Sequence, residues 1–143
     1  MKPTEIKLAE NAKILIVEDD SDQRRLLVKI VQEAFGCEIL EAEDGLEALQ
    51  IIIQGKQAPN LILLDLMMPW LTGVEFLTVV RGRPEFDQIP IVVCTVLAET
   101  NELKGRIGNH VQGYLAKPIN KEKLLDKLVA ALHNIAFRVD YQS

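Results

Sequence analysis

Short runs of aliphatic residues alternate with longer, partly polar stretches along most of this 143-residue chain. The runs at 14–17, 61–64 and 91–94 are too short for a helix and are typical of strands buried on both faces of a sheet. Segments 37–42 and 111–116 resemble two further strands, and the first is polar enough for a sheet edge. The pattern therefore predicts five strands.

The stretches between these strands carry apolar residues at helical spacing. Ser21 or Asp22 can cap a first helix, and its expected buried positions are Leu26, Leu27, Ile30, Val31, Ala34 and Phe35. A second helix starts from Asp44 and is expected to bury Leu46, Leu49, Ile52 and Ile53. A third is expected to bury Val74, Leu77 and Val80.

Two more helices are predicted near the end of the chain. Segment 99–110 is the weaker candidate, because its two glycines each cost about 1 kcal/mol relative to alanine inside a helix, and we expect it to be short or mobile. The last helix fades near Phe137, and its shared apolar face consists of Leu124, Leu125, Leu128, Val129 and Leu132.

Alternation of strands and helices over the whole length predicts an α/β fold. The expected architecture is a flavodoxin-like, three-layer (βα)5 arrangement, whose five-stranded parallel sheet has the order 2-1-3-4-5. We expect residues 1–12 to form an extension, residues 13–138 a single domain and residues 139–143 a tail.

Composition and charge exclude several classes of function. The chain is 48% hydrophobic and 26% charged, as in ordinary soluble proteins. No apolar run approaches the roughly 20 residues that span a bilayer, so we expect a cytoplasmic protein without membrane association. The net charge of −5 argues against direct nucleic-acid binding. Cys37 and Cys94 are too few and too far apart for a zinc site, and we expect both in the core.

Polar side chains stand at the carboxyl ends of four of the five predicted strands. They are Glu18 and Asp19 after the first strand, Asp65 after the third, Thr95 after the fourth and Lys117 after the fifth. Parallel strands bring these ends to one edge of the sheet, where ligands bind. Two alternatives to a functional site stay open at this point. Asp65 taken alone could equally well be a loop residue before the turn at Pro69. The acids taken together could simply be solvated residues at the ends of strands.

Clustered carboxylates repel one another unless a cation neutralises them, and their oxygens suit Mg²⁺. Lys117 adds a fixed positive charge and Thr95 a hydroxyl, and both suit phosphate oxygens. The chemistry that this set fits is transfer of a phosphoryl group to Asp65 as the nucleophile.

These residues resemble the receiver domain of two-component response regulators. The resemblance covers about residues 13–137 and rests on the motifs Ile14–Asp20, Leu63–Pro69 with Gly73, Thr95 and Tyr114–Pro118. It implies that Asp65 is the phosphoacceptor. It also implies an Mg²⁺ site made by Asp19 directly, by Glu18 partly through water, by Asp65 and by the backbone carbonyl of Met67.

The same resemblance implies a conformational switch. Thr95 would bond one phosphoryl oxygen and Lys117 another, and the bond between Lys117 and Pro118 would be cis. Movement of Thr95 toward the phosphoryl group would leave space for the aromatic ring of Tyr114. The output surface would then be the fourth helix, fifth strand and fifth helix.

Three residues depart from the family or stand at its variable positions. Val96 is bulkier than the usual alanine or serine, while Met67 and Leu97 are apolar and would not orient a hydrolytic water. We therefore hypothesise a long-lived aspartyl phosphate.

The leading function is a signalling module of a phosphorelay. It would receive its phosphoryl group from a histidine kinase or phosphotransfer protein, act on a downstream protein target and allow a phosphorylation-dependent homodimer. The alternatives are an aspartate-nucleophile phosphohydrolase, which would need an acid where Met67 stands, and a binding module that is not phosphorylated. Both a stand-alone regulator and a part of a larger protein remain open.

Overall fold

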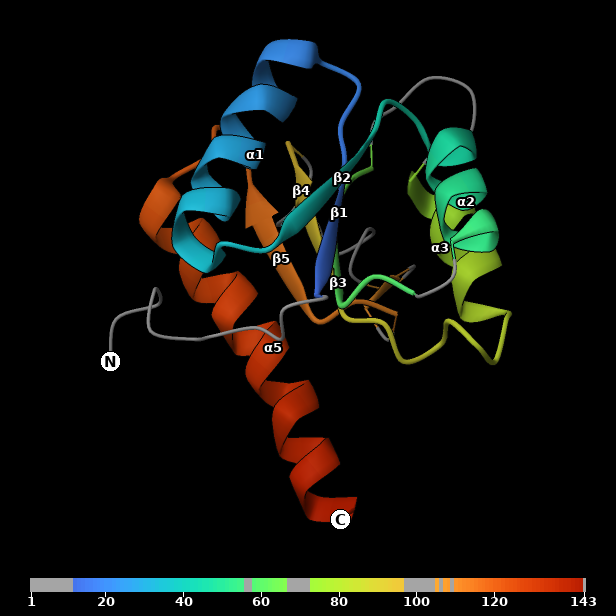
Figure 1. Ribbon diagram of the computed structural model, residues 1–143. Helices are drawn as coiled ribbons and strands as arrows, with labels where there is room; N and C mark the ends of the chain where they lie inside the picture. Colours follow the sequence, from blue (N-terminus) through green and yellow to red (C-terminus); the bar gives the residue numbers. More distant parts are fainter. Residues whose placement is uncertain are drawn as a thin grey trace.

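A five-stranded parallel sheet forms the centre of the molecule (Figure 1). The computed structural model of the protein describes residues 12–55, 58–66, 73–96, 105, 107–108 and 110–142, with side chains as far as Leu132. The strands are β1 (Lys13–Val17), β2 (Glu38–Ala42), β3 (Leu61–Asp65), β4 (Ile91–Thr95) and β5 (Gly113–Ala116). Their order is β2-β1-β3-β4-β5, which confirms the predicted flavodoxin-like α/β fold.

Helices cover both faces of this sheet and complete the three layers. Figure 1 shows α1 (Ser21–Phe35) and α5 (Lys121–Gln142) on one side, and α2 (Gly45–Gln54) and α3 (Gly73–Arg81) on the other. Alternate residues of one strand serve opposite cores: Ile14 and Ile16 pack with α1 and α5, whereas Leu15 and Val17 pack with α2 and α3. Burial on both faces explains why the central strands are continuously aliphatic.

The ends of α1 follow local backbone chemistry. Asp20 caps the helix through a 2.8 Å bond from the Gln23 amide to its Oδ1, so the cap lies one residue before Ser21 and two before Asp22, the two predicted caps. Gly36 ends the helix with φ 65°, a left-handed conformation that favours glycine.

The predicted apolar stripes of α1 and α2 were wrong at three positions. Leu26 is 51% exposed, Leu46 54% and Ile53 50%. In α2 the predicted Ile52 is buried, and Ala48, which was not predicted, is buried with it. The helical phase is set by which residues reach the sheet, and a run of adjacent apolar residues does not specify that phase.

Both cysteines are buried, as expected. Burial raises the pKa of the Cys94 thiol to about 12, so it remains protonated in the core. Helix α5 continues to Gln142, past the predicted end near Phe137. The predicted helix at 99–110 lies largely outside the described residues. Within the described part of the chain, no helix is long and apolar enough to cross a membrane.

Candidate functional site

Three buried polar or charged side chains occur in the described part of the chain, and all three belong to the predicted site. They are Glu18, Asp65 and Thr95, which are 1%, 5% and 0% exposed. Glu18 follows β1, Asp65 ends β3 and Thr95 ends β4. Because the strands are parallel, the sheet brings these ends to one edge. Burying polar groups is costly unless they are paired, so this placement indicates a function.

Lys117 joins two of the carboxylates from the end of β5. Its Nζ donates hydrogen bonds to Glu18 Oε1 at 2.7 Å and to Asp65 Oδ2 at 3.0 Å. The lysine thus links β5 to residues that lie 99 and 52 positions away in the sequence. The peptide bond between Lys117 and Pro118 is cis, as expected.

The three acids converge closely enough to bind one cation. Carboxylate oxygens of Glu18, Asp19 and Asp65 lie within 4.8 Å of one another. Glu18 and Asp65 are buried, whereas Asp19 is exposed and reaches the group from the solvent side. Three carboxylates with one lysine leave excess negative charge, and a hard divalent cation with oxygen ligands fits this donor set.

Burial perturbs both partners of the central ion pair. Loss of solvation raises the pKa of Glu18 to about 7, and the neighbouring Asp65 carboxylate adds to the rise while Lys117 opposes it. Burial alone would lower the pKa of Lys117, but its hydrogen bonds to Glu18 and Asp65 raise the value above normal. Lys117 therefore remains a cation, and the Glu18 carboxylate takes up a proton more readily than an exposed glutamate does.

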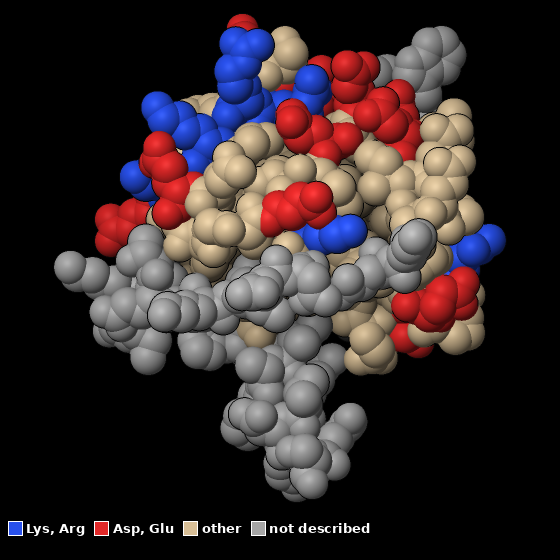
Figure 2. All heavy atoms as spheres, viewed as in Figure 1, with Lys and Arg blue, Asp and Glu red and all other residues tan. Residues whose placement is uncertain are grey.

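The turn between β1 and α1 orients the Glu18 carboxylate. The Asp20 amide donates to Glu18 Oε2 at 3.2 Å, while Lys117 occupies Oε1. The site opens into a cavity of about 260 Å³, which is lined by Glu18, Asp19, Asp20, Gln23, Asp65, Val96 and Lys117. Figure 2 shows acidic and basic side chains intermixed at the upper end of the molecule, near the ends of β1 and β2 in Figure 1.

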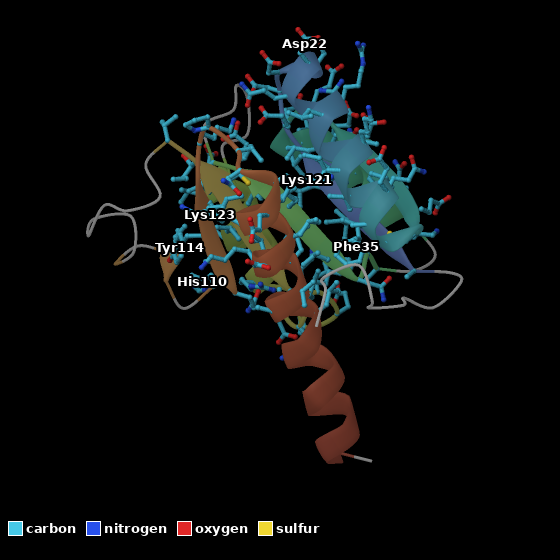
Figure 3. The ribbon with its side chains drawn as sticks, turned by 90° about the vertical axis from the view of Figure 1, so that its left-hand side faces the viewer. Asp22, Phe35, His110, Tyr114, Lys121 and Lys123 are labelled. Carbon is cyan, nitrogen blue, oxygen red and sulfur yellow. The ribbon has the colours of Figure 1, made fainter. Side chains whose placement is uncertain are left out.

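Thr95 and Tyr114 occupy neighbouring strands with a fixed relation. Thr95 pairs with Ala116 across β4 and β5, and Tyr114 pairs with Val93, two residues below Thr95. Tyr114 and Val93 belong to the core beneath α2 and α3, so Thr95 points to the same face of the sheet. Figure 3 labels Tyr114 on β5. Its hydroxyl is buried and has no hydrogen-bond partner among the described residues.

Some site residues lie outside the prediction or outside the described structure. Met67 and Leu97 fall beyond the described residues. Val96 is 68% exposed and lines the cavity beside Asp65. Arg24 was not predicted, although its guanidinium donates to the Glu18 carbonyl oxygen at 2.8 Å. The sequence feature that could have indicated it is an arginine on the first turn of the helix directly after the acids Glu18, Asp19 and Asp20.

Known proteins of one family resemble this chain. The response regulator receiver domain family matches residues 14–129. Chemotaxis protein CheY-3 from Vibrio cholerae is 31% identical over 121 residues, covering 85% of this chain and 92% of that protein. Sensor histidine kinase CheAY from Helicobacter pylori is 30% identical over 122 residues, covering 85% of this chain and 15% of the kinase. The solved structure of the chemotaxis response regulator CheY4 from Vibrio cholerae has a TM-score of 0.76 at 33% identity, covering 85% of this chain and 99% of that chain.

Proposed function

This chain belongs to the response regulator receiver domain family, whose members act in phosphorylation-dependent signalling, and we propose that Asp65 is the residue that accepts the phosphoryl group. One observation carries this proposal: Asp65 is a buried carboxylate at the end of β3, 3.0 Å from the Lys117 ammonium and beside the carboxylates of Glu18 and Asp19. A buried nucleophile beside a fixed cation suits phosphoryl transfer, in which catalysis is mostly positioning and charge neutralisation.

The acidic group would hold Mg²⁺ through Asp19, Asp65, Glu18 and the backbone carbonyl of Met67. The bound ion would neutralise the charge that gathers on the phosphoryl oxygens. Because Lys117 contacts both Glu18 and Asp65 in this structure, its ammonium lies where a phosphoryl oxygen on Asp65 would need a counter-charge. The hydroxyl of Thr95, at the end of the next strand, would donate to a second phosphoryl oxygen.

In the proposed reaction, an oxygen of Asp65 attacks the phosphorus of the donor. A bond forms between phosphorus and the carboxylate oxygen, and the bond from phosphorus to the donor's leaving group breaks. For a histidine donor, that leaving group is an imidazole nitrogen, which retains the electron pair and takes up a proton. Lys117 remains protonated throughout, since its raised pKa suits a fixed charge.

Receiver domains interact with histidine kinases and with downstream targets, and the likeness to part of the kinase CheAY fits this pattern. For this chain, the proposed donor is a histidine kinase or phosphotransfer protein. The proposed output surface is the helix predicted at 99–110, together with β5 and α5. A hollow of about 670 Å³ between β5 and α5, which Tyr114, Lys123 and Lys127 help to line, supports that surface. A phosphorylation-dependent homodimer and a cytoplasmic location remain predictions.

Val96 supports a slow loss of the phosphoryl group. Its exposed apolar side chain lines the cavity beside Asp65 and offers no hydrogen bond to an attacking water. We expect the aspartyl phosphate to persist for minutes or longer in Mg²⁺, and Val96→Ala to shorten its lifetime. Intact-mass measurement over time follows the decay of the phosphorylated protein. Decay of the wild-type aspartyl phosphate within seconds would show that Val96 does not shield it.

Incubation with Mg²⁺ and acetyl phosphate, followed by intact-mass measurement, tests the function itself. The receiver gains one phosphoryl group, and Asp65→Asn does not. Asp22→Asn is the matched control, because Asp22 is an exposed acid on the first turn of α1. Turnover of acetyl phosphate without an adduct would instead indicate a hydrolase, and no reaction would indicate a binding module. Neither alternative is favoured by the family or by the site.

A further inference from the structure

Arg24 connects three parts of the chain around the acidic site. From α1 its Nη1 donates to the backbone carbonyl oxygen of Glu18 at 2.8 Å. Its Nε donates to Glu41 Oε1 at 3.2 Å, and Nη2 lies 3.9 Å from a carboxylate oxygen of Glu43, just beyond β2. The Arg24 side chain is only 14% exposed, so these contacts fix it between α1 and β2.

The carbonyl contact is the part of this arrangement that concerns the site. Glu41 and Glu43 are half or more exposed, and exposed ion pairs contribute little energy. The Glu18 carbonyl, in contrast, belongs to the peptide that leads directly to Asp19. The Glu18 amide is already fixed by a 3.0 Å bond to the Ala42 carbonyl oxygen. Arg24 therefore fixes the carbonyl group of Glu18, while the Ala42 carbonyl fixes its amide. The orientation of the peptide plane between Glu18 and Asp19 is thereby set, and with it the direction of the Asp19 side chain.

We propose that Arg24 is a positioning residue of the phosphoryl-transfer site, which acts through the Glu18 carbonyl to keep Asp19 directed at Asp65. This inference rests on the proposed function, because it concerns the same acids as ligands of Mg²⁺. Asp19 is the exposed member of the group, and an exposed carboxylate on a turn depends on its backbone for direction. Arginine suits this task because its planar fork donates to the carbonyl and to Glu41 simultaneously.

Charge and geometry predict opposite effects of losing Arg24. A cation near three carboxylates repels Mg²⁺, so through-space electrostatics alone would make Arg24→Met bind the ion more tightly. Loss of positioning makes it bind more weakly, by roughly tenfold, because removal of a residue that orients metal ligands typically costs at least that much affinity. The sign of the change therefore separates the two roles.

The test is a calorimetric titration of Mg²⁺ into the unphosphorylated protein. Arg24→Met should weaken binding roughly tenfold, and Arg24→Lys should fall between it and wild type, because lysine keeps the charge but lacks the fork. Arg25→Met is the matched control, since Arg25 is the adjacent arginine and is exposed. In the metal-free protein, amide hydrogen exchange at Asp19 and Asp20 should become faster in Arg24→Met and not in Arg25→Met.

Thermal unfolding of each variant separates positioning from stability, because a merely structural role lowers the melting temperature and leaves the Mg²⁺ affinity of the folded protein unchanged. Equal or tighter binding by Arg24→Met overturns the proposal, as does equal weakening by Arg25→Met. Should Arg24→Met not fold, an unchanged affinity in Arg24→Lys has the same meaning. If Mg²⁺ binding depends on Arg24 but the wild-type protein takes up no phosphoryl group, only the proposed function is contradicted. If the wild-type protein binds no Mg²⁺, the proposed function and the positioning role of Arg24 are both overturned.

Discussion

Glu18 is the residue at which burial and charge conflict most directly. Its carboxylate is almost inaccessible to solvent, yet a metal ligand must be ionised. Its pKa rises from 4.5 to about 7 on folding, mainly because burial removes solvation. Between these two values the folded protein binds more protons than the unfolded chain, so the stability of the metal-free protein decreases as the pH rises through this window.

Mg²⁺ binding should depend on pH for the same reason. The ion needs the ionised form of Glu18 and therefore displaces its proton at low pH. We expect the dissociation constant for Mg²⁺ to increase about tenfold between about pH 8 and about pH 6. Calorimetry across this range measures the change, and Glu18→Gln should remove most of it. A dissociation constant that is independent of pH in the wild type would contradict the raised pKa.

Arg81 plays a structural part at the opposite end of the strands. Its guanidinium donates to the carbonyl oxygens of His110 at 2.8 Å and Asp87 at 3.1 Å, and to Gln112 Oε1 at 3.2 Å. Arg81→Met should lower the free energy of unfolding by about 1.5–3 kcal/mol, the range for hydrogen bonds to a charged group. Urea unfolding measures this loss.

Arg83 provides the control for that measurement. It forms an exposed ion pair with Glu85 at 3.5 Å, and such pairs are worth roughly 0–1 kcal/mol. Arg83→Met should therefore change stability by less than Arg81→Met, while both variants accept a phosphoryl group normally. Equal losses would show that the Arg81 contacts contribute no more than an exposed pair.

Residue type predicted much of the candidate site, and local geometry explains the rest. Glu18, Asp65 and Lys117 were predictable because each follows an aliphatic strand, and parallel strands place those ends together. Arg24 was not, since its role depends on a backbone carbonyl, which every residue possesses. Asp20 was not predicted as the helix cap either, because Asp20, Ser21 and Asp22 are all residue types that cap helices well. Only the backbone angles distinguish them.

At the scale of elements, the start of α3 controls how β3 ends. The Gly73 amide donates to the Leu66 carbonyl oxygen at 3.2 Å. A Cβ at Gly73 would lie 2.5 Å from Leu66 Cα and 2.8 Å from the backbone oxygen of Asp65. Gly73→Ala should therefore displace the backbone of the proposed phosphoacceptor, destabilise the protein by about 1–3 kcal/mol and slow phosphorylation.

Gly105→Ala is the matched control for Gly73→Ala, because a Cβ at Gly105 meets no other atom. Nothing lies within 4 Å of a Cβ at Gly105, and the residue is helical. Alanine should stabilise the protein there by about 0.5–1 kcal/mol, because it restricts the unfolded chain. Thermal unfolding and the rate of phosphorylation by acetyl phosphate compare the two variants. A Gly73→Ala protein with wild-type stability and rate would contradict the close approach.

The number and type of the described elements could be predicted, whereas the buried faces of the helices could not be predicted fully. Strands were identifiable because burial on both faces demands continuous aliphatic runs. In α1 and α2, adjacent leucines and isoleucines allow more than one helical phase. The sheet selects Leu27 and Ile52 for burial and leaves Leu26 and Ile53 exposed.

At the scale of the whole molecule, one sheet serves both stability and chemistry. Its faces are covered by two separate apolar cores, and its carboxyl edge carries the buried polar residues Glu18, Asp65 and Thr95. The edge could be predicted because alternation of strands and helices fixes a parallel topology. How tightly Lys117 contacts Glu18 and Asp65 could not, because these residues are distant in sequence and meet only in the folded chain.

The location of the phosphoryl group tests the central claim most directly. Protein treated with acetyl phosphate and Mg²⁺ is reduced with borohydride, which converts an aspartyl phosphate to homoserine, and its peptides are then sequenced by mass spectrometry. The structure predicts homoserine at position 65 alone, with none in Asp65→Asn. Homoserine at position 19 or 20 in place of 65, or none at any position despite a gain in intact mass, would contradict Asp65 as the phosphoacceptor.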